Sequence, residues 1–155
     1  MELAIVDPAI RVDDLYRLHR SRLARLAFLL TGSAEIADEL AQEAFVRLWP
    51  RVDEIRDPAA YLTTTVANLA RGHWRRLAVE RRHAPVPPGP ALPADVDEVW
   101  SQLWCLPERE RSALVLRFYA DLDIAGVAKA MGCRLGTAKS LVHRGLAHLK
   151  EVLEQ

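Results

Sequence analysis

The segment from Asp121 to Arg144 has the residue spacing of a helix-turn-helix, an arrangement that can read duplex DNA. Asp123 is a good N-cap, and Gly132 stands where the end of a helix favours a left-handed residue. Between them, apolar side chains recur at the helical period, at Ile124, Val127, Ala128 and Met131. The segment therefore predicts a short amphipathic helix, a sharp turn and a second helix.

The second helix of this segment carries basic and hydroxyl side chains beside one apolar stripe. In a helix-turn-helix this helix lies in the major groove, and its N-terminal residues come nearest to the base edges. The predicted duplex-binding residues are Arg134, Thr137, Lys139, Ser140, His143 and Arg144. A helical hairpin with a solvated basic face is the alternative interpretation of the same pattern.

A second candidate site lies on a helix predicted from residue 59 to about residue 82. Side chains follow one another there at steps of three or four: Tyr61, Thr64 or Thr65, Asn68, Arg71 and Arg75, with Arg76 beside them. An aromatic ring, hydroxyls, an amide and guanidinium groups are what the binding of unstacked single-stranded DNA requires. The alternative role of Tyr61 is that of a half-buried core residue. Trp74 is either a core residue or a second stacking platform.

Three helices are predicted to position this second site. The first has apolar residues at helical spacing between Val12 and Leu30 and ends at Gly32. The second, from about residue 34 to residue 49, begins after Ser33 and has one apolar and one acidic face. The third begins after Asp57, with a proline in its first turn. Because no alternating strand pattern competes with the helical period, the predicted fold class is all-α.

The chain is predicted to contain two helical units. Residues 84–95 include five prolines and a glycine, which cannot continue a helix and favour an extended spacer. With 155 residues, of which 50% are hydrophobic, the chain can bury one moderate core or two small ones. The expected organisation is a domain at 1–83, a linker at 84–95 and a helix-turn-helix domain at 96–155.

The formal net charge is zero, but the charges are segregated along the chain. Residues 71–83 hold five arginines and a single acid, whereas residues 35–43 hold four acids and no base. The basic segment suits a polyanion such as DNA, and the acidic segment repels one.

Several functions are not expected from this sequence. There is no long uncharged apolar run, so we expect neither a signal peptide nor a membrane span. The protein is therefore expected to be cytoplasmic. Cys105 and Cys133 lack ligand spacing and are expected to be reduced, buried thiols, with a redox role as the alternative. The five histidines form no metal-ligand pattern, and no nucleophile motif is present. We therefore expect no metal, no cofactor and no enzymatic activity.

The order of four motifs resembles that of a two-domain bacterial sigma factor, specifically the extracytoplasmic-function (ECF) group of the sigma-70 family. The motifs are the acidic helix ending in Phe-Val-Arg-Leu-Trp at residues 45–49, Tyr-Leu-Thr-Thr-Thr-Val-Ala-Asn-Leu-Ala-Arg at residues 61–71, the proline-rich linker, and Leu-Pro-Glu-Arg-Glu-Arg at residues 106–111 before the helix-turn-helix. The resemblance implies a protein that binds core RNA polymerase, recognises minus-thirty-five and minus-ten promoter elements and promotes DNA melting. The alternative is another helix-turn-helix regulator, which would need a ligand-binding or phosphoryl-acceptor domain.

The resemblance also implies partners and residue roles. The clamp helices of the polymerase would bind Asp38, Glu39, Leu40, Gln42 and Glu43. The loop at 50–57 and the helix after it would hold a flipped base of the minus-ten element, with Tyr61, Thr64, Asn68, Arg71, Arg75 and Arg76 as the matching residues. The helix-turn-helix unit would read the minus-thirty-five element and touch the polymerase flap. An anti-sigma protein is an expected inhibitor.

Two residues depart from the family pattern in the recognition helix. Arg134 stands where the family usually has a serine-like cap, and Leu141 replaces an arginine. We expect Leu141 to enlarge an apolar face that a regulator uses. The promoter sequence and the inducing signal do not follow from the sequence.

Overall fold

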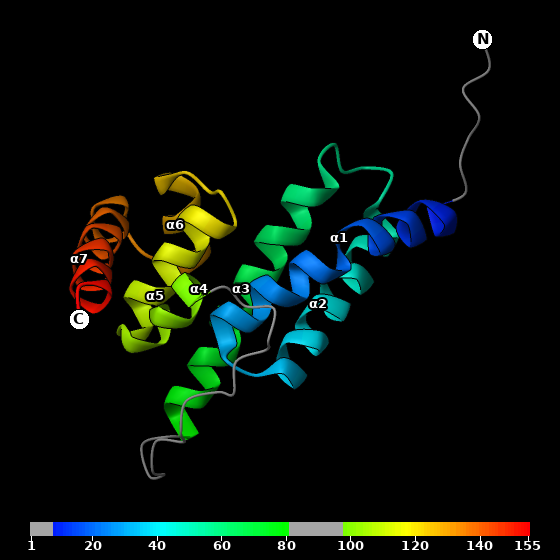
Figure 1. Ribbon diagram of the computed structural model, residues 1–155. Coiled ribbons are helices and arrows are strands. Elements are labelled where there is room, and N and C mark those ends of the chain that lie inside the picture. Colours follow the sequence, from blue (N-terminus) through cyan, green and yellow to red (C-terminus); the bar gives the residue numbers. More distant parts are fainter. Residues whose placement is uncertain (1–7, 81–97) are drawn as a thin grey trace.

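The computed structural model describes residues 8–80 and 98–155, and the regular elements of that part of the chain are all helices (Figure 1). This confirms the predicted fold class. The predicted linker at 84–95 lies outside the described residues. The boundaries of the two domains therefore stay predictions.

The N-terminal unit consists of α1(Pro8–Thr31), α2(Ala34–Leu48), the 3₁₀ turn η1(Trp49–Arg51) and α3(Pro58–Glu80). The chain leaves α1 through Gly32, whose φ of 77° is left-handed. Ser33 then caps α2, because its side chain accepts a hydrogen bond from the Ile36 N–H at 3.2 Å. Asp57 accepts one from the Ala60 N–H at 3.1 Å at the start of α3. The predicted helix boundaries are confirmed at these three points.

The C-terminal unit begins with α4(Glu98–Gln102), η3(Leu103–Cys105) and α5(Glu108–Leu114). The helix continues as a five-residue π-helix, η4(Val115–Tyr119), in which the Ala120 N–H donates to the Val115 carbonyl at 3.0 Å. The helix-turn-helix is α6(Ile124–Met131) and α7(Leu135–Leu153). Asp123 caps α6, and Gly132 has a φ of 64°, both as predicted. Arg134 occupies the N-cap position of α7 without a capping hydrogen bond from its side chain.

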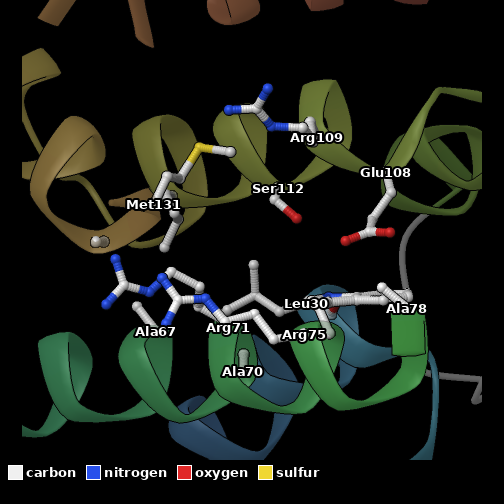
Figure 2. A pocket seen from close by; sticks show the side chains of 13 residues that line it. Leu30, Ala67, Ala70, Arg71, Arg75, Ala78, Glu108, Arg109, Ser112 and Met131 are labelled. Atoms are coloured by element: carbon white, nitrogen blue, oxygen red, sulfur yellow. The ribbon is translucent and has the colours of Figure 1, made fainter. Parts of the chain in front are cut away.

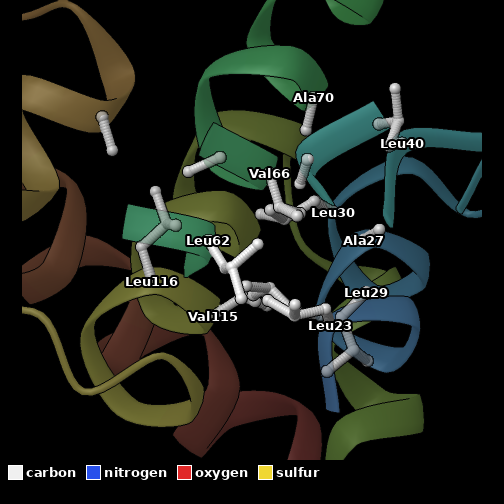
Figure 3. Packing of buried hydrophobic residues seen from close by; sticks show 14 of the residues in the cluster. Leu23, Ala27, Leu29, Leu30, Leu40, Leu62, Val66, Ala70, Val115 and Leu116 are labelled. Atoms are coloured by element: carbon white, nitrogen blue, oxygen red, sulfur yellow. The ribbon is translucent and has the colours of Figure 1, made fainter. Parts of the chain in front are cut away.

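The two units pack against each other as well as within themselves. Helix α3 contacts α6, and α1 contacts both α5 and η4. Val115 and Leu116 of η4 join Leu23 of α1 and Leu62 of α3 in one buried hydrophobic cluster (Figure 3). In this arrangement the units share a continuous core, although a proline-rich segment separates them in the sequence.

The turn between α6 and α7 depends on glycine. Any other residue at position 132 would have to adopt the left-handed backbone conformation, which side chains disfavour. Its Cβ would also collide with the guanidinium of Arg71 in α3. We expect Gly132→Ala to lower the free energy of unfolding by about 1 kcal/mol or more. Gly72→Ala, in the interior of α3 with no atom within 4 Å of the added carbon, should instead raise it by about 0.5–1 kcal/mol. Denaturant unfolding of the two variants checks the opposite signs, and equal stabilities would contradict them.

Candidate nucleic-acid interfaces

One cavity gathers the uncharged residues of the predicted single-strand site. It has a volume of about 250 Å³ and is lined by Arg47, Tyr61, Thr64, Thr65 and Asn68. We call it the base pocket. Tyr61 is half-buried against the core, and its hydroxyl donates to the Arg47 carbonyl at 3.5 Å. One edge of the ring is therefore fixed while the residue still lines the pocket.

The structure separates the roles of the two neighbouring threonines. Thr65 is buried, and its hydroxyl donates to the Tyr61 carbonyl at 2.7 Å. Thr64 is partly exposed beside Asn68, which is exposed. Thr64 is thus the threonine that can offer its hydroxyl to a ligand.

The predicted arginines do not line the base pocket. Tyr61 and Arg75 lie 14 positions apart, which is about 21 Å along a helix. Arg71 and Arg75 instead line a cavity of about 240 Å³ between α3 and the C-terminal unit, opposite Ser112 and Met131 (Figure 2). Arg76 is exposed and lines neither cavity. The predicted site is therefore divided into an uncharged part and a basic part.

An aromatic and cationic stack connects the two units next to this cavity. Arg111 of α5 is 6% exposed, and its Cζ lies 4.0 Å from the ring centroid of Trp104 and 5.7 Å from that of Trp74. Burial lowers the pKa of Arg111 from its ordinary value to about 10, against the opposing effect of the Glu108 carboxylate. The Trp74 indole donates to the Leu30 carbonyl at 2.6 Å. Of its two predicted roles, the structure thus favours the packing role for Trp74.

The predicted duplex-binding residues lie together at the N-terminal half of α7. Five of them are exposed, and Thr137 is partly exposed. The Arg144 Nε donates to the Ser140 carbonyl at 3.4 Å, which holds this guanidinium along the helix. The opposite side of α7 packs on α6 and α5 through Ala138, Leu141 and Val142. The arrangement leaves a basic helix face free to enter a groove of DNA.

The acidic face of α2 is partly confirmed as a surface. Asp38, Glu39 and Gln42 are exposed, but Leu40 is buried. Glu43 accepts a hydrogen bond from the Arg47 Nε at 3.0 Å, so its charge is partly neutralised. Leu40 thus supports this surface from beneath.

Two apolar grooves were not predicted from the sequence. The first lies between α1 and α2 beside Gln42, where Val46 and Trp49 are 64% and 53% exposed. The second has a volume of about 250 Å³ and lies on the C-terminal unit, lined by Trp100, Leu103, Leu114, Phe118, Leu146 and Leu149. The sequence signal that could have indicated them is an aromatic residue on the polar side of an amphipathic helix, as at Trp49 and Phe118. Exposed apolar area of this kind is typical of protein-binding surfaces.

Two expectations are wrong. Leu141 is 3% exposed, because α7 turns it into the core, so it cannot enlarge an apolar surface. Cys105 is exposed at the end of η3 rather than buried, while Cys133 is partly buried. In the described ranges 8–80 and 98–155, no three His, Cys, Asp or Glu side chains are grouped as metal ligands. The helices described there are too short or too polar to cross a membrane.

The fold and these surfaces define a helical DNA-binding protein of the helix-turn-helix class. The family model for sigma-70 region 2 matches residues 15–79, and the model for sigma-70 region 4 matches residues 97–149. The chain belongs to the sigma-70 family of RNA polymerase sigma factors, in its ECF group. It is a promoter-recognising sigma factor, and the alternative of another helix-turn-helix regulator is not favoured. Sigma factors are transcription initiation factors rather than enzymes.

Individual relatives agree with this assignment. The chain is 32% identical to the RNA polymerase sigma-E factor of Streptomyces avermitilis, over 94% of this chain and 86% of that protein. It is 29% identical to the ECF sigma factor SigE of Mycolicibacterium smegmatis, over 91% of this chain and 61% of that protein. Its fold is similar to that of the sigma factor RpoE in complex with the anti-sigma factor NepR from Bartonella quintana. The TM-score is 0.71 at 23% identity, over 92% of this chain and 96% of that one.

Proposed function

We propose that this ECF sigma factor divides its promoter-binding work between three surfaces. The base pocket holds an unpaired base of the minus-ten element, the basic face of α7 reads the minus-thirty-five element, and the exposed acids of α2 bind the clamp helices of the polymerase. The observation that carries the proposal is the base pocket, where an aromatic ring, a hydroxyl and an amide meet in one cavity. The expected domains at 1–83 and 96–155 would separate these tasks.

The base pocket has the chemistry that capture of an extruded base requires. Stacking on an aromatic ring is worth roughly 1–3 kcal/mol per base, which offsets the few kcal/mol that unpairing costs. The adjoining loop is held in place, because Val52 is 1% exposed and Asp53 pairs with Arg11 at 3.4 Å. A fixed loop beside the pocket supports base capture with little ordering cost.

The contacts with core polymerase would use charge and apolar area together. Asp38 and Glu39 supply negative charge, and the neighbouring groove with Val46 and Trp49 supplies apolar area. The second groove, on the C-terminal unit, is entirely apolar in its lining residues and suits an apolar helix of the polymerase flap. Arg71 and Arg75 both line the cavity between the units, where Arg71 is partly buried and Arg75 is exposed. Arg75 could therefore contact promoter DNA in the present arrangement of the units.

An anti-sigma protein is the proposed regulator. The proposal is supported by the RpoE structure of similar fold, which was solved with the anti-sigma factor NepR, and by the two apolar grooves. Purification of the protein from resting cells should yield a bound inhibitor. Finding only free protein that is active in those cells would contradict this part of the proposal.

The function is tested by transcription from a genomic DNA library with sigma-free core polymerase of a related bacterium. Addition of this protein should produce new transcript starts that share two upstream elements. If a core that responds to another sigma factor yields no new starts, and does not bind this protein, the proposal is wrong.

Removal of the stacking ring or of the amide should impair DNA melting. We expect Tyr61→Ala and Asn68→Ala to reduce open-complex formation by about 10-fold to 100-fold, because each removes roughly 1–3 kcal/mol of stacking or base-edge hydrogen bonding. Affinity for core polymerase should stay within about twofold, because both residues lie on α3 away from the acidic face. Permanganate footprinting measures the melting, and equal footprints would exclude the base pocket.

The exposed cations of α7 should control the salt dependence of duplex binding. We expect Lys139→Ala or Arg144→Ala to lower the slope of log affinity against log salt by about 0.9 for each phosphate that is no longer neutralised. Binding of a minus-thirty-five duplex between 50 and 200 mM salt, about the range where such interactions are resolved, measures this slope. A weaker affinity that depends on the base sequence, with an unchanged slope, would instead indicate an interaction with a base edge.

A further inference from the structure

Arg47 links the acidic face of α2 to the base pocket. It lies one helical turn after Glu43, and its Nε donates to the Glu43 carboxylate at 3.0 Å. It also lines the base pocket, and its carbonyl accepts the Tyr61 hydroxyl. Its side chain is 52% exposed, so the guanidinium is accessible from solvent. Its position in the acidic helix gave no reason to select this residue from the sequence pattern.

Among the described residues that line the base pocket, Arg47 is the one that carries a positive charge. The other residues that line it, Tyr61, Thr64, Thr65 and Asn68, are all uncharged. A nucleotide brings a phosphate with its base, and half or more of protein–DNA hydrogen bonds go to phosphate and sugar. Arg71 and Arg75 line the cavity between the units instead. The phosphate of a nucleotide in the base pocket would therefore have the Arg47 guanidinium as its nearest cation among the lining residues.

We propose that Arg47 is a further promoter-binding residue, whose guanidinium contacts a phosphate of the unpaired minus-ten strand at the base pocket. The inference rests on the proposed function of that pocket. Only Nε of the guanidinium is hydrogen-bonded within the described part of the chain, so both terminal amino groups can donate to phosphate oxygens. Glu43 acts as a positioning residue, since its pairing with Nε restricts the rotation of the side chain.

The contribution of Glu43 is small in comparison. An exposed ion pair four residues apart on a helix changes an equilibrium by at most about fivefold. A charge-assisted hydrogen bond to phosphate changes it by about tenfold or more. The decisive variant is therefore Arg47→Ala, which removes the guanidinium but keeps the carbonyl to which Tyr61 donates.

The experiment measures binding of a fluorescent single-stranded oligonucleotide, carrying the minus-ten element found by transcript mapping, to the holoenzyme. We expect Arg47→Ala to weaken binding about tenfold and to lower the salt slope by about 0.7. Arg47→Lys should keep the slope, because it keeps the charge. The matched control is Arg17→Ala, which removes an equally spaced ion pair with Asp13 on α1 and should bind like the wild type.

The outcomes separate this inference from the proposed function. If Arg47→Ala matches the Arg17→Ala control in both affinity and slope while Tyr61→Ala and Asn68→Ala are impaired, the Arg47 inference is wrong and the base pocket stands. If all three pocket variants bind normally, the proposed function of the pocket fails first. Reduced core polymerase affinity in Arg47→Ala, with unchanged affinity of its remaining holoenzyme for the oligonucleotide, would also overturn the inference and assign Arg47 to polymerase docking.

Discussion

Replacing Asp38 and Glu39 together by lysine is expected to weaken binding to core RNA polymerase by about 100-fold or more. Both side chains are exposed on α2, and in the proposed complex the two lysines would face polymerase clamp helices that are expected to be basic. Like charges placed opposite each other at an interface cost several kcal/mol, and each 1.4 kcal/mol is a factor of ten in affinity. The effect is measured as the dissociation constant of the fluorescently labelled variant for core RNA polymerase.

A matched control separates docking from net charge. Glu151→Lys with Glu154→Lys introduces the same change of charge at the exposed end of α7 and should leave core affinity within about threefold, as expected of screened charges outside the docking surface. Thermal unfolding of both variants verifies that they fold. Wild-type core affinity in the α2 variant would show that this acidic face is not the docking surface.

Truncation of Trp104 should cause the largest decrease in stability at the contact between the units. Its ring packs 6.2 Å from that of Phe28 in α1 and covers the guanidinium of Arg111. Trp104 is partly buried, and replacing a large packed aromatic side chain by alanine costs about 3–5 kcal/mol. The variant would also remove the nearer of the two rings that face the buried Arg111 guanidinium. We expect Trp104→Ala to lower the melting temperature by about 6–20 °C, at about 2–4 °C for each kcal/mol.

The comparison with an exposed tryptophan tests the role of burial. Trp49→Ala, at a residue that is 53% exposed, should cost no more than about 0.5 kcal/mol. Adding Arg111→Met to Trp104→Ala should recover part of the stability, because it removes a desolvated charge whose pKa burial has already lowered to about 10. Equal melting temperatures for the Trp49 and Trp104 variants would show that the stack does not hold the units together.

The helices and their ends could be predicted because their causes are local. Ser33, Asp123 and Gly132 act on backbone groups within a few residues, so their effect can be recognised from the sequence. The exposed face of α7 follows from the helical period for the same reason. These local patterns are sufficient for the order of elements and for the exposure of the predicted duplex-binding residues.

The division of the single-strand site could not be predicted, because it depends on contacts between distant segments. Tyr61 and Arg71 follow one spacing along α3, but α2 covers the first part of that face and α6 the second. Arg47 enters the base pocket only through the packing of α2 on α3. Leu141 and Cys105 were misplaced for a similar reason, since the depth of a residue depends on which neighbour covers it.

The π-helix η4 has a consequence for comparing this chain with its relatives. Each of its hydrogen bonds joins residues five positions apart, whereas those of an α-helix join residues four apart. The one extra residue rotates the side chains that follow by about 100° around the helix axis. Val115 can thereby face the shared core while Phe118 opens onto the C-terminal groove. A relative whose helix is regular throughout would align with a one-residue gap inside 115–119. If the alignment omitted that gap, residue roles copied from the relative would be assigned to the wrong side of the helix.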